Sequence, residues 1–155
     1  MCSRPLPRRR RRDESGAVAV EFALLVPLLL LIVLGTIQYG SYFYSSQAGS
    51  DIARDAARRA AVGDPVSCAD FKATVQDGID AVAGHSATTY IKRTYVRRPA
   101  GRTGDLLPGD EVTVKFQFQA FDMNIPFVPV PNDGKITSTV KVRLEYVPEQ
   151  PEECP

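Results

Sequence analysis

Residues 17–37 read AVAVEFALLVPLLLLIVLGTI, and this stretch decides the fold of the chain. It contains one ionisable side chain, Glu21. As an α-helix it would measure about 31 Å, which is enough to cross a hydrocarbon core of about 30 Å. Pro27 and Gly35 are compatible with such a helix, because both residue types are common in membrane spans. The sequence therefore predicts a transmembrane helix over residues 17–38.

The charges on the two sides of this segment indicate its orientation. Residues 1–16 contain six arginines and two acidic side chains, a net charge of +4, whereas the rest of the chain carries −3. Because basic flanks stay in the cytoplasm, we expect the basic leader 1–16 inside the cell and the remainder outside the membrane. A basic head on a mildly acidic body favours a topology signal over a nucleic-acid surface, so we expect no nucleic-acid partner.

A secretory signal peptide is the main alternative for this N-terminal segment. Ser46-Gln47-Ala48 would offer a cleavage site of small residues, and a soluble domain would then be released. The apolar part of a signal peptide is about 7–15 residues long, whereas this stretch is longer and continues into an aromatic run. We therefore interpret the segment as an anchor.

Glu21 needs an explanation, because a carboxylate in a membrane helix is costly. One explanation is the helix dipole, which stabilises an acid near a helix N-terminus. The other begins at Gly16, which four small apolar residues separate from Glu21 and Phe22. This Gly-x4-Glu-Phe pattern beside an arginine run resembles a site for a prepilin-type peptidase, which cuts after the glycine. The resemblance implies cleavage between Gly16 and Ala17, with Glu21 and Phe22 acting in processing and assembly.

A longer resemblance covers residues 15–62. The segment reads SGAVAVEFALLVPLLLLIVLGTIQYG and continues, after a short aromatic run, as SSQAGSDIARDAARRAAVG. The Gly-Ala-x-x-Val-Glu-Phe-Ala opening, the Val26-Pro27 pair and the Ala- and Arg-rich continuation resemble the TadE-like family, pilin-like membrane proteins of tight-adherence (Flp-type) pilus systems. The resemblance implies a single-pass minor pseudopilin of the bacterial cytoplasmic membrane that takes part in assembling such a pilus or a related envelope secretion apparatus. The expected partners are membrane lipid, a prepilin-type peptidase, and other pilins or pilus-assembly proteins.

The helical pattern continues past the membrane as an extension over residues 39–62. Four alanines recur there at helical spacing and make one small-residue face. They are Ala53, Ala56, Ala57 and Ala60. Such a face lets another element approach closely. Packing against the protein's own outer domain and packing against other subunits both remain open.

Residues 63–148 predict a small extracytoplasmic α+β domain. Apolar residues within 67–83 recur at helical spacing, which predicts a second helix. Three segments with β-branched, aromatic or alternating apolar residues predict strands. They are 89–96, 111–121 and 135–147. We expect a pilin-like arrangement of one helix on about three antiparallel strands, followed by an acidic, proline-rich tail at 149–155.

A proline-rich loop joins the last two predicted strands. Pro126, Pro129 and Pro131 precede an Asn-Asp-Gly turn signal. The apolar residues between and beside these prolines are Phe127, Val128 and Val130. These residues either fold back on the domain core or form a tip that binds a partner.

The three cysteines suggest one disulfide. Cys2 would stay in the cytoplasm or be removed with the leader, which leaves Cys68 and Cys154 to pair in an oxidising compartment. In the chain-entropy model, closing a loop of that length contributes about 4–5 kcal/mol. Two unpaired, buried cysteines are the alternative.

No sequence pattern points to catalysis. The chain lacks a nucleophile elbow, a phosphate-binding glycine loop and metal-ligand spacing around its single histidine, His85. We therefore expect no enzyme activity, no cofactor, no metal and no small-molecule substrate. The alternative function is an uncleaved, membrane-anchored binding module with a β-rich outer domain.

Overall fold

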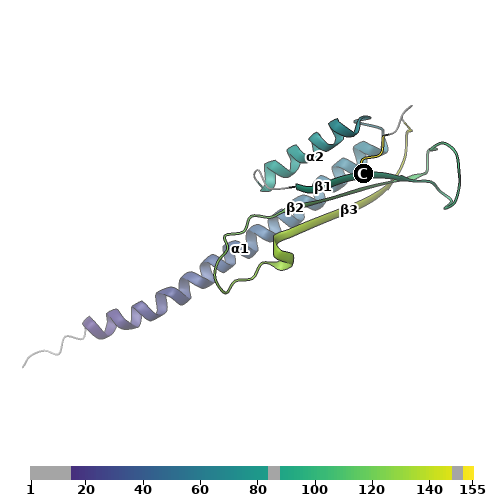
Figure 1. The fold of residues 1–155 in the computed structure, drawn as a ribbon. Helices are drawn as coiled ribbons and strands as arrows, with labels where there is room; N and C mark the ends of the chain where they lie inside the picture. The colour runs from purple at the N-terminus through teal and green to yellow at the C-terminus, as the bar shows by residue number, and fades with distance from the viewer. Residues whose placement is uncertain (1–14, 84–87, 148–151) are drawn as a thin grey trace, which may run out of the picture.

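The computed structural model describes residues 15–83, 88–147 and 152–155, which form two helices and one three-stranded antiparallel sheet (Figure 1). The elements are α1 (Ser15–Ala61), α2 (Cys68–Ala83), β1 (Thr88–Val96), β2 (Glu111–Gln119), the short turn η1 (Pro131–Gly134) and β3 (Lys135–Arg143). This confirms the predicted α+β class, with a long apolar N-terminal helix followed by a helix and three strands. Most of the leader, His85 and residues 148–151 lie outside the described residues.

Helix α1 is a continuous rod of 47 residues, about 70 Å long at 1.5 Å per residue. Its end is marked by Gly63, whose φ of +76° is a left-handed conformation that glycine adopts without a steric penalty. The Asp64 N–H donates to the Arg59 carbonyl (3.0 Å), and the Gly63 N–H donates to the Ala60 carbonyl (3.2 Å). These two bonds satisfy carbonyl groups that the end of the helix would otherwise leave unpaired.

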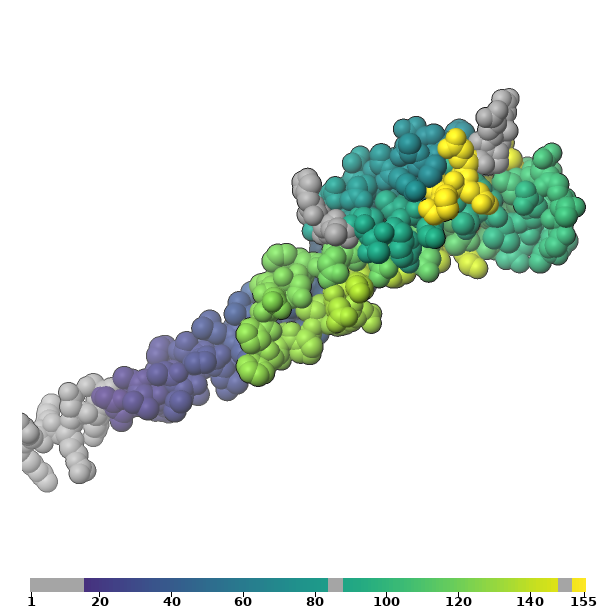
Figure 2. Space-filling view, in the orientation of Figure 1, coloured from purple at the N-terminus to yellow at the C-terminus, as the bar shows by residue number. Residues whose placement is uncertain are grey.

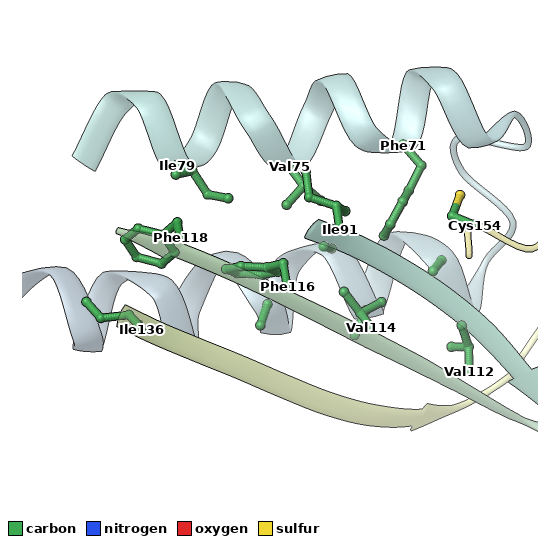
Figure 3. Packing of buried hydrophobic residues seen from close by; sticks show 14 of the residues in the cluster. Phe71, Val75, Ile79, Ile91, Val112, Val114, Phe116, Phe118, Ile136 and Cys154 are labelled. Atoms are coloured by element: carbon green, nitrogen blue, oxygen red, sulfur yellow. The ribbon is translucent and has the colours of Figure 1, made fainter. Parts of the chain in front are cut away.

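The sheet has the order β1-β2-β3, and one of its faces is buried beneath the helices. Helix α1 contacts β2 and β3, helix α2 contacts β1, and the two helices contact each other. Every second residue of β2 points into this core, as the predicted alternation requires. These residues are Val112, Val114, Phe116 and Phe118. Residues of α2 point toward the sheet from the opposite side of the core (Figure 3). They are Phe71, Val75 and Ile79.

Small residues let α1 lie close to the sheet. The four alanines of the predicted face are buried, each at most 4% exposed, so the protein's own domain occupies that face. One turn before them, a Cβ atom at Gly49 would lie 2.9 Å from the Phe118 ring and 3.2 Å from Ser138 Oγ. A Cβ at Gly78 of α2 would lie 3.3 Å from Ile52 of α1. Larger side chains at these positions would push the layers apart.

Two strands are shorter than the sequence predicted, because other hydrogen bonds take over at their ends. Strand β2 ends at Gln119, and the next N–H, that of Ala120, donates to the Gly134 carbonyl (2.8 Å). Strand β3 ends at Arg143, after which the Leu144 N–H donates to the Asp110 carbonyl (2.7 Å). In both cases a turn residue replaces the neighbouring strand as the bonding partner.

The C-terminal residues are fastened to both α2 and β1. A disulfide joins Cys68, the first residue of α2, to Cys154, with the two Cα atoms 5.4 Å apart. Cys154 also pairs with Arg93 at the outer edge of β1. The Arg93 N–H donates to the Cys154 carbonyl (3.0 Å), and the Cys154 N–H donates to the Arg93 carbonyl (2.8 Å). The described end of the predicted irregular tail is therefore bound to the domain.

The Arg93 side chain sits beneath this junction and is fully buried. Its guanidinium donates to the carbonyl oxygens of Pro65 (2.7 Å), Val66 (2.8 Å) and Glu152 (3.0 Å). It also lies over the Phe71 ring, 4.6 Å from the centroid. Burial lowers the pKa of Arg93, and the nearby Tyr95 and Glu152 act in the opposite direction. Backbone carbonyls thus replace the water that this cation gives up on folding.

We predict that the double substitution Cys68→Ser and Cys154→Ser lowers the free energy of unfolding by up to about 4–5 kcal/mol, because the disulfide closes a long loop. Chemical denaturation of the full chain in detergent micelles measures this value. Cys2→Ser serves as the control and should have little effect. An unchanged stability of the double variant would mean that Arg93 and the backbone pairing hold the tail without the covalent bond.

Asp110 closes the long loop between β1 and β2. Its side chain is buried, and its carboxylate accepts hydrogen bonds from the N–H groups of Arg98 (2.7 Å) and Leu107 (2.8 Å) and from the Arg102 guanidinium. The bond from Arg102 is the main reason that the pKa of Asp110 falls from 3.8 to about 2. Burial acts against this shift, but the hydrogen bonds outweigh it.

We predict that the Asp110 carboxylate makes the free energy of unfolding depend on pH in the acidic range. The folded pKa lies below the ordinary value, so the contribution is complete above about pH 4 and is lost as the pH falls through about 2. The difference in free energy of unfolding between wild type and Asp110→Asn should therefore shrink over that interval. Denaturation series at several acidic pH values measure it, with Asp77→Asn on the exposed side of α2 as the control. A difference that stays constant from about pH 5 to pH 2 would contradict this account.

A matched pair of glycines tests the close approach of α1 to the sheet. Gly49→Val should lower the free energy of unfolding by about 1–3 kcal/mol, because the new side chain meets the buried Phe118 ring. Gly40→Val is the control, since a Cβ there meets nothing within 4 Å. Thermal or chemical unfolding of both variants in micelles gives the comparison. Equal effects would mean that the sheet moves aside at little cost.

Candidate functional site

The first half of α1 is exposed along its whole circumference. Among the described residues, α1 is the one helix that is long and apolar enough to cross a membrane, and none of its most apolar window is buried by the protein. Apart from the half-buried Val26, the large apolar side chains within residues 18–34 are 38–74% exposed. A surface this apolar needs a non-aqueous environment or a partner. Figure 1 shows this half of the helix projecting away from the folded domain.

The predicted processing residues lie in the first turns of this free helix. Gly16, Ala17, Glu21 and Phe22 are all exposed. A Cβ at Gly16 would meet nothing within 4 Å, so the fold itself gives no steric reason for a glycine there. Packing therefore does not explain why this position, the second residue of the described helix, is a glycine.

Glu21 has no ion-pair partner in the described part of the chain. Ala17 lies four residues before it, so the two share one face of the helix. A carboxylate in so apolar a helix is costly unless a cation pairs with it. The structure brings no other ionisable side chain to this end of the described helix.

A second site lies where the predicted span ends. Gln38 is 1% exposed because the segment after β2 covers it. Its Nε2 group donates to the Phe121 carbonyl (3.1 Å), and its Oε1 atom accepts from the Met123 N–H (2.8 Å). The Tyr39 hydroxyl donates to the Pro129 carbonyl (2.8 Å). These bonds fix the loop against α1, and Figure 2 shows it lying on the helix below the domain.

The apolar residues of this loop were predicted either to fold back on the domain or to form an exposed tip, and the structure shows some of each. Val128 folds back on the helix, 3.8 Å from where a Cβ of Gly35 would be, and Val130 packs against the domain core. Phe127 does not fold back and is 94% exposed. Between loop and helix runs an apolar groove. It is lined by Leu31, Ile32, Gly35, Tyr39, Phe127 and Val128, among others.

No cluster of metal-ligating side chains forms among the described residues. Within ranges 15–83, 88–147 and 152–155, no three His, Cys, Asp or Glu side chains come together as a possible ligand set. Further hollows lie on the folded domain, and the proline loop itself forms one of them between Asp122 and Asp133.

Sequence reasoning missed three polar residues that the fold depends on. They are Gln38, Arg93 and Asp110, each at most 1% exposed. Gln38 did carry a signal, since it is a lone amide directly after the apolar run. Arg93 sits at an inward position of an alternating strand, where a charge is rare without partners. Asp110 gave no such signal in a loop rich in polar residues.

The N-terminal part of the chain is similar to a known protein family. Residues 16–58 match the family model described as TadE-like protein. The match begins at Gly16, ends inside α1 and covers less than a third of the chain; for this segment it confirms the predicted resemblance. No curated protein and no solved structure shows significant similarity to the chain.

Proposed function

From the TadE-like match over residues 16–58, we propose that this chain is a membrane-anchored minor pseudopilin that takes part in assembling a Flp-type (tight-adherence) pilus or a related envelope apparatus. The match and the candidate span together support the broader statement that it is a membrane protein related to Tad pili. The proposal of a pseudopilin role rests on the exposed N-terminal half of α1. Gly16 and Glu21 lie there and have no role in the chain's own packing.

The proposed topology puts the arginine-rich leader in the cytoplasm, the span in the bacterial cytoplasmic membrane and the folded domain outside. The charge difference between the two flanks supports this orientation. The Cys68–Cys154 disulfide also supports it, because disulfides persist in oxidising compartments and are rare in the cytoplasm.

The proposed processing step is hydrolysis of the Gly16–Ala17 peptide bond by a prepilin-type peptidase. The step would remove the basic leader and leave a free amino group on Ala17. A carboxylate in a low-dielectric environment is costly unless it is paired, so Glu21 would attract such an amine from a neighbouring subunit. The catalytic groups belong to the peptidase, and the proposal assigns none to this chain.

The uncleaved binding module and the released soluble domain remain the competing functions. A soluble form beginning at Gly49 would lose Gln38 and Tyr42, of which the first fixes the loop and the second lies in the core. Because both residues contact the folded domain, their contacts argue for a protein in which the domain and the N-terminal helix stay joined. The cleaved and uncleaved anchored forms differ only in their N-terminus.

We predict that the mature protein begins at Ala17 and that Gly16→Leu blocks its formation, because a bulky side chain would occupy the position before the cut bond. The intact mass and the N-terminal residue of the protein from its native cells decide this. Gly40→Leu, at an exposed glycine farther along the same helix, is the control and should be processed normally.

The variant Glu21→Gln distinguishes a role of Glu21 in processing from a role in pilus assembly. The proposal expects this variant to be trimmed at Ala17 yet to fail in pilus assembly, since the amide cannot neutralise an amine. A wild-type protein that keeps Met1 in cells would favour the uncleaved module. Normal trimming of Gly16→Leu would show that the cleavage site lies elsewhere.

A further inference from the structure

The loop between β2 and η1 combines an apolar sequence with an unusual position. Residues 123–131 read MNIPFVPVP and contain no ionisable side chain. We propose that this loop is a second membrane contact, which dips into the outer leaflet and buries the Phe127 ring among lipid acyl chains. The inference rests on the proposed membrane anchoring of α1 and adds a contact made by the outer domain itself.

The depth of the loop along α1 supports this assignment. Val128 packs at Gly35, inside the predicted span, and Phe127 lines the same groove as Leu31 and Ile32. These two helix residues lie about 9–10 Å before residue 38, the end of the predicted span, along the helix axis at 1.5 Å per residue. Elements that lie in the membrane interface bury their apolar side about 5–10 Å deep. A loop held beside Leu31 and Ile32 therefore reaches the acyl chains if α1 spans the bilayer.

The protein itself satisfies part of the backbone of the loop. Irregular backbone is expensive at membrane depth unless its polar groups are satisfied by the protein. Pro126, Pro129 and Pro131 remove three N–H donors. The Val128 N–H donates to the Ile125 carbonyl (3.2 Å), and the Pro129 carbonyl accepts from the Tyr39 hydroxyl. The bonds of Gln38 to Phe121 and Met123 protect the point where the loop leaves the domain.

The fold covers little of the surface of Phe127. Its ring is 94% exposed, more than any other large apolar side chain in the described ranges. Its φ of +67° is disfavoured for an aromatic residue, yet the flanking prolines and the Tyr39 bond hold the loop in place. Asp122, exposed at the start of the loop, lies outside its uncharged stretch and would remain in the headgroup region. Lipid is thus the occupant that matches both the chemistry and the depth.

A single-tryptophan experiment tests the proposal, since the chain contains no tryptophan. Three full-length variants are reconstituted separately in phosphatidylcholine vesicles, with or without phosphatidylcholine brominated on its acyl chains. They are Phe127→Trp, Leu28→Trp and Tyr146→Trp. Leu28 lies in the span and Tyr146 beside Ala61 at the far end of α1, and each is 58% exposed in the structure. Circular dichroism checks that all three retain the fold.

We expect the bromolipid to quench the fluorescence of the Phe127→Trp variant several-fold more than that of Tyr146→Trp, and nearly as much as that of Leu28→Trp. The emission of Phe127→Trp should also shift to the blue on reconstitution. Quenching at 28 but no more at 127 than at 146 would overturn the inference and leave the membrane anchor intact. A blue shift at 127 that grows with the protein-to-lipid ratio, without bromolipid quenching, would overturn it in favour of contact with a second copy. Absence of quenching at position 28 would remove the anchoring premise and the inference with it.

Discussion

The fold depends on one helix, α1, whose first part is suited to an apolar environment and whose later part packs against the sheet. Before residue 31, α1 is almost entirely apolar and largely exposed, while its later part has one buried face of glycine and alanine. No turn or hinge in the described helix separates the two parts. The small residues decide how near the sheet can come, because a helix with larger side chains there would hold Phe118 away. The domain is therefore built onto the anchor and not merely tethered to it.

The folded domain is small, and polar connections reinforce its core. Arg93, Asp110 and Gln38 are each buried, and each binds backbone groups from a different segment: the C-terminal residues, the β1–β2 loop and the proline loop. Each uses a side chain to satisfy loop backbone that no strand or helix would pair. The disulfide adds a covalent bond where Arg93 already holds the chain.

Much of this architecture could be predicted from sequence, because the periodic patterns of apolar residues that mark helices and strands are set locally and do not depend on residues far away in the chain. The apolar run, the alternation in β2 and the Gly-Asp-Pro stop after α1 are local signals. The strand ends were misjudged, since Gly134 and Asp110 compete for the last N–H groups only once the chain is folded. The fate of Phe127 and Val128 was open for the same reason: the prolines mark a loop but not the helix it lies against. The roles of Gly16 and Glu21 stay predictions, since no partner molecule is present to test them.

The continuity of α1 also makes the molecule a lever. The helix runs on from the predicted span to Ala61, a further arm of about 36 Å at 1.5 Å per residue. Membrane helices tilt by about 20° on average, and a tilt of that size swings the far end of such an arm sideways by about 12 Å. Because the sheet is packed along this arm, it would swing with it as one body. Tilting movements of the helix inside the bilayer are thus magnified into larger displacements at the tip of the domain.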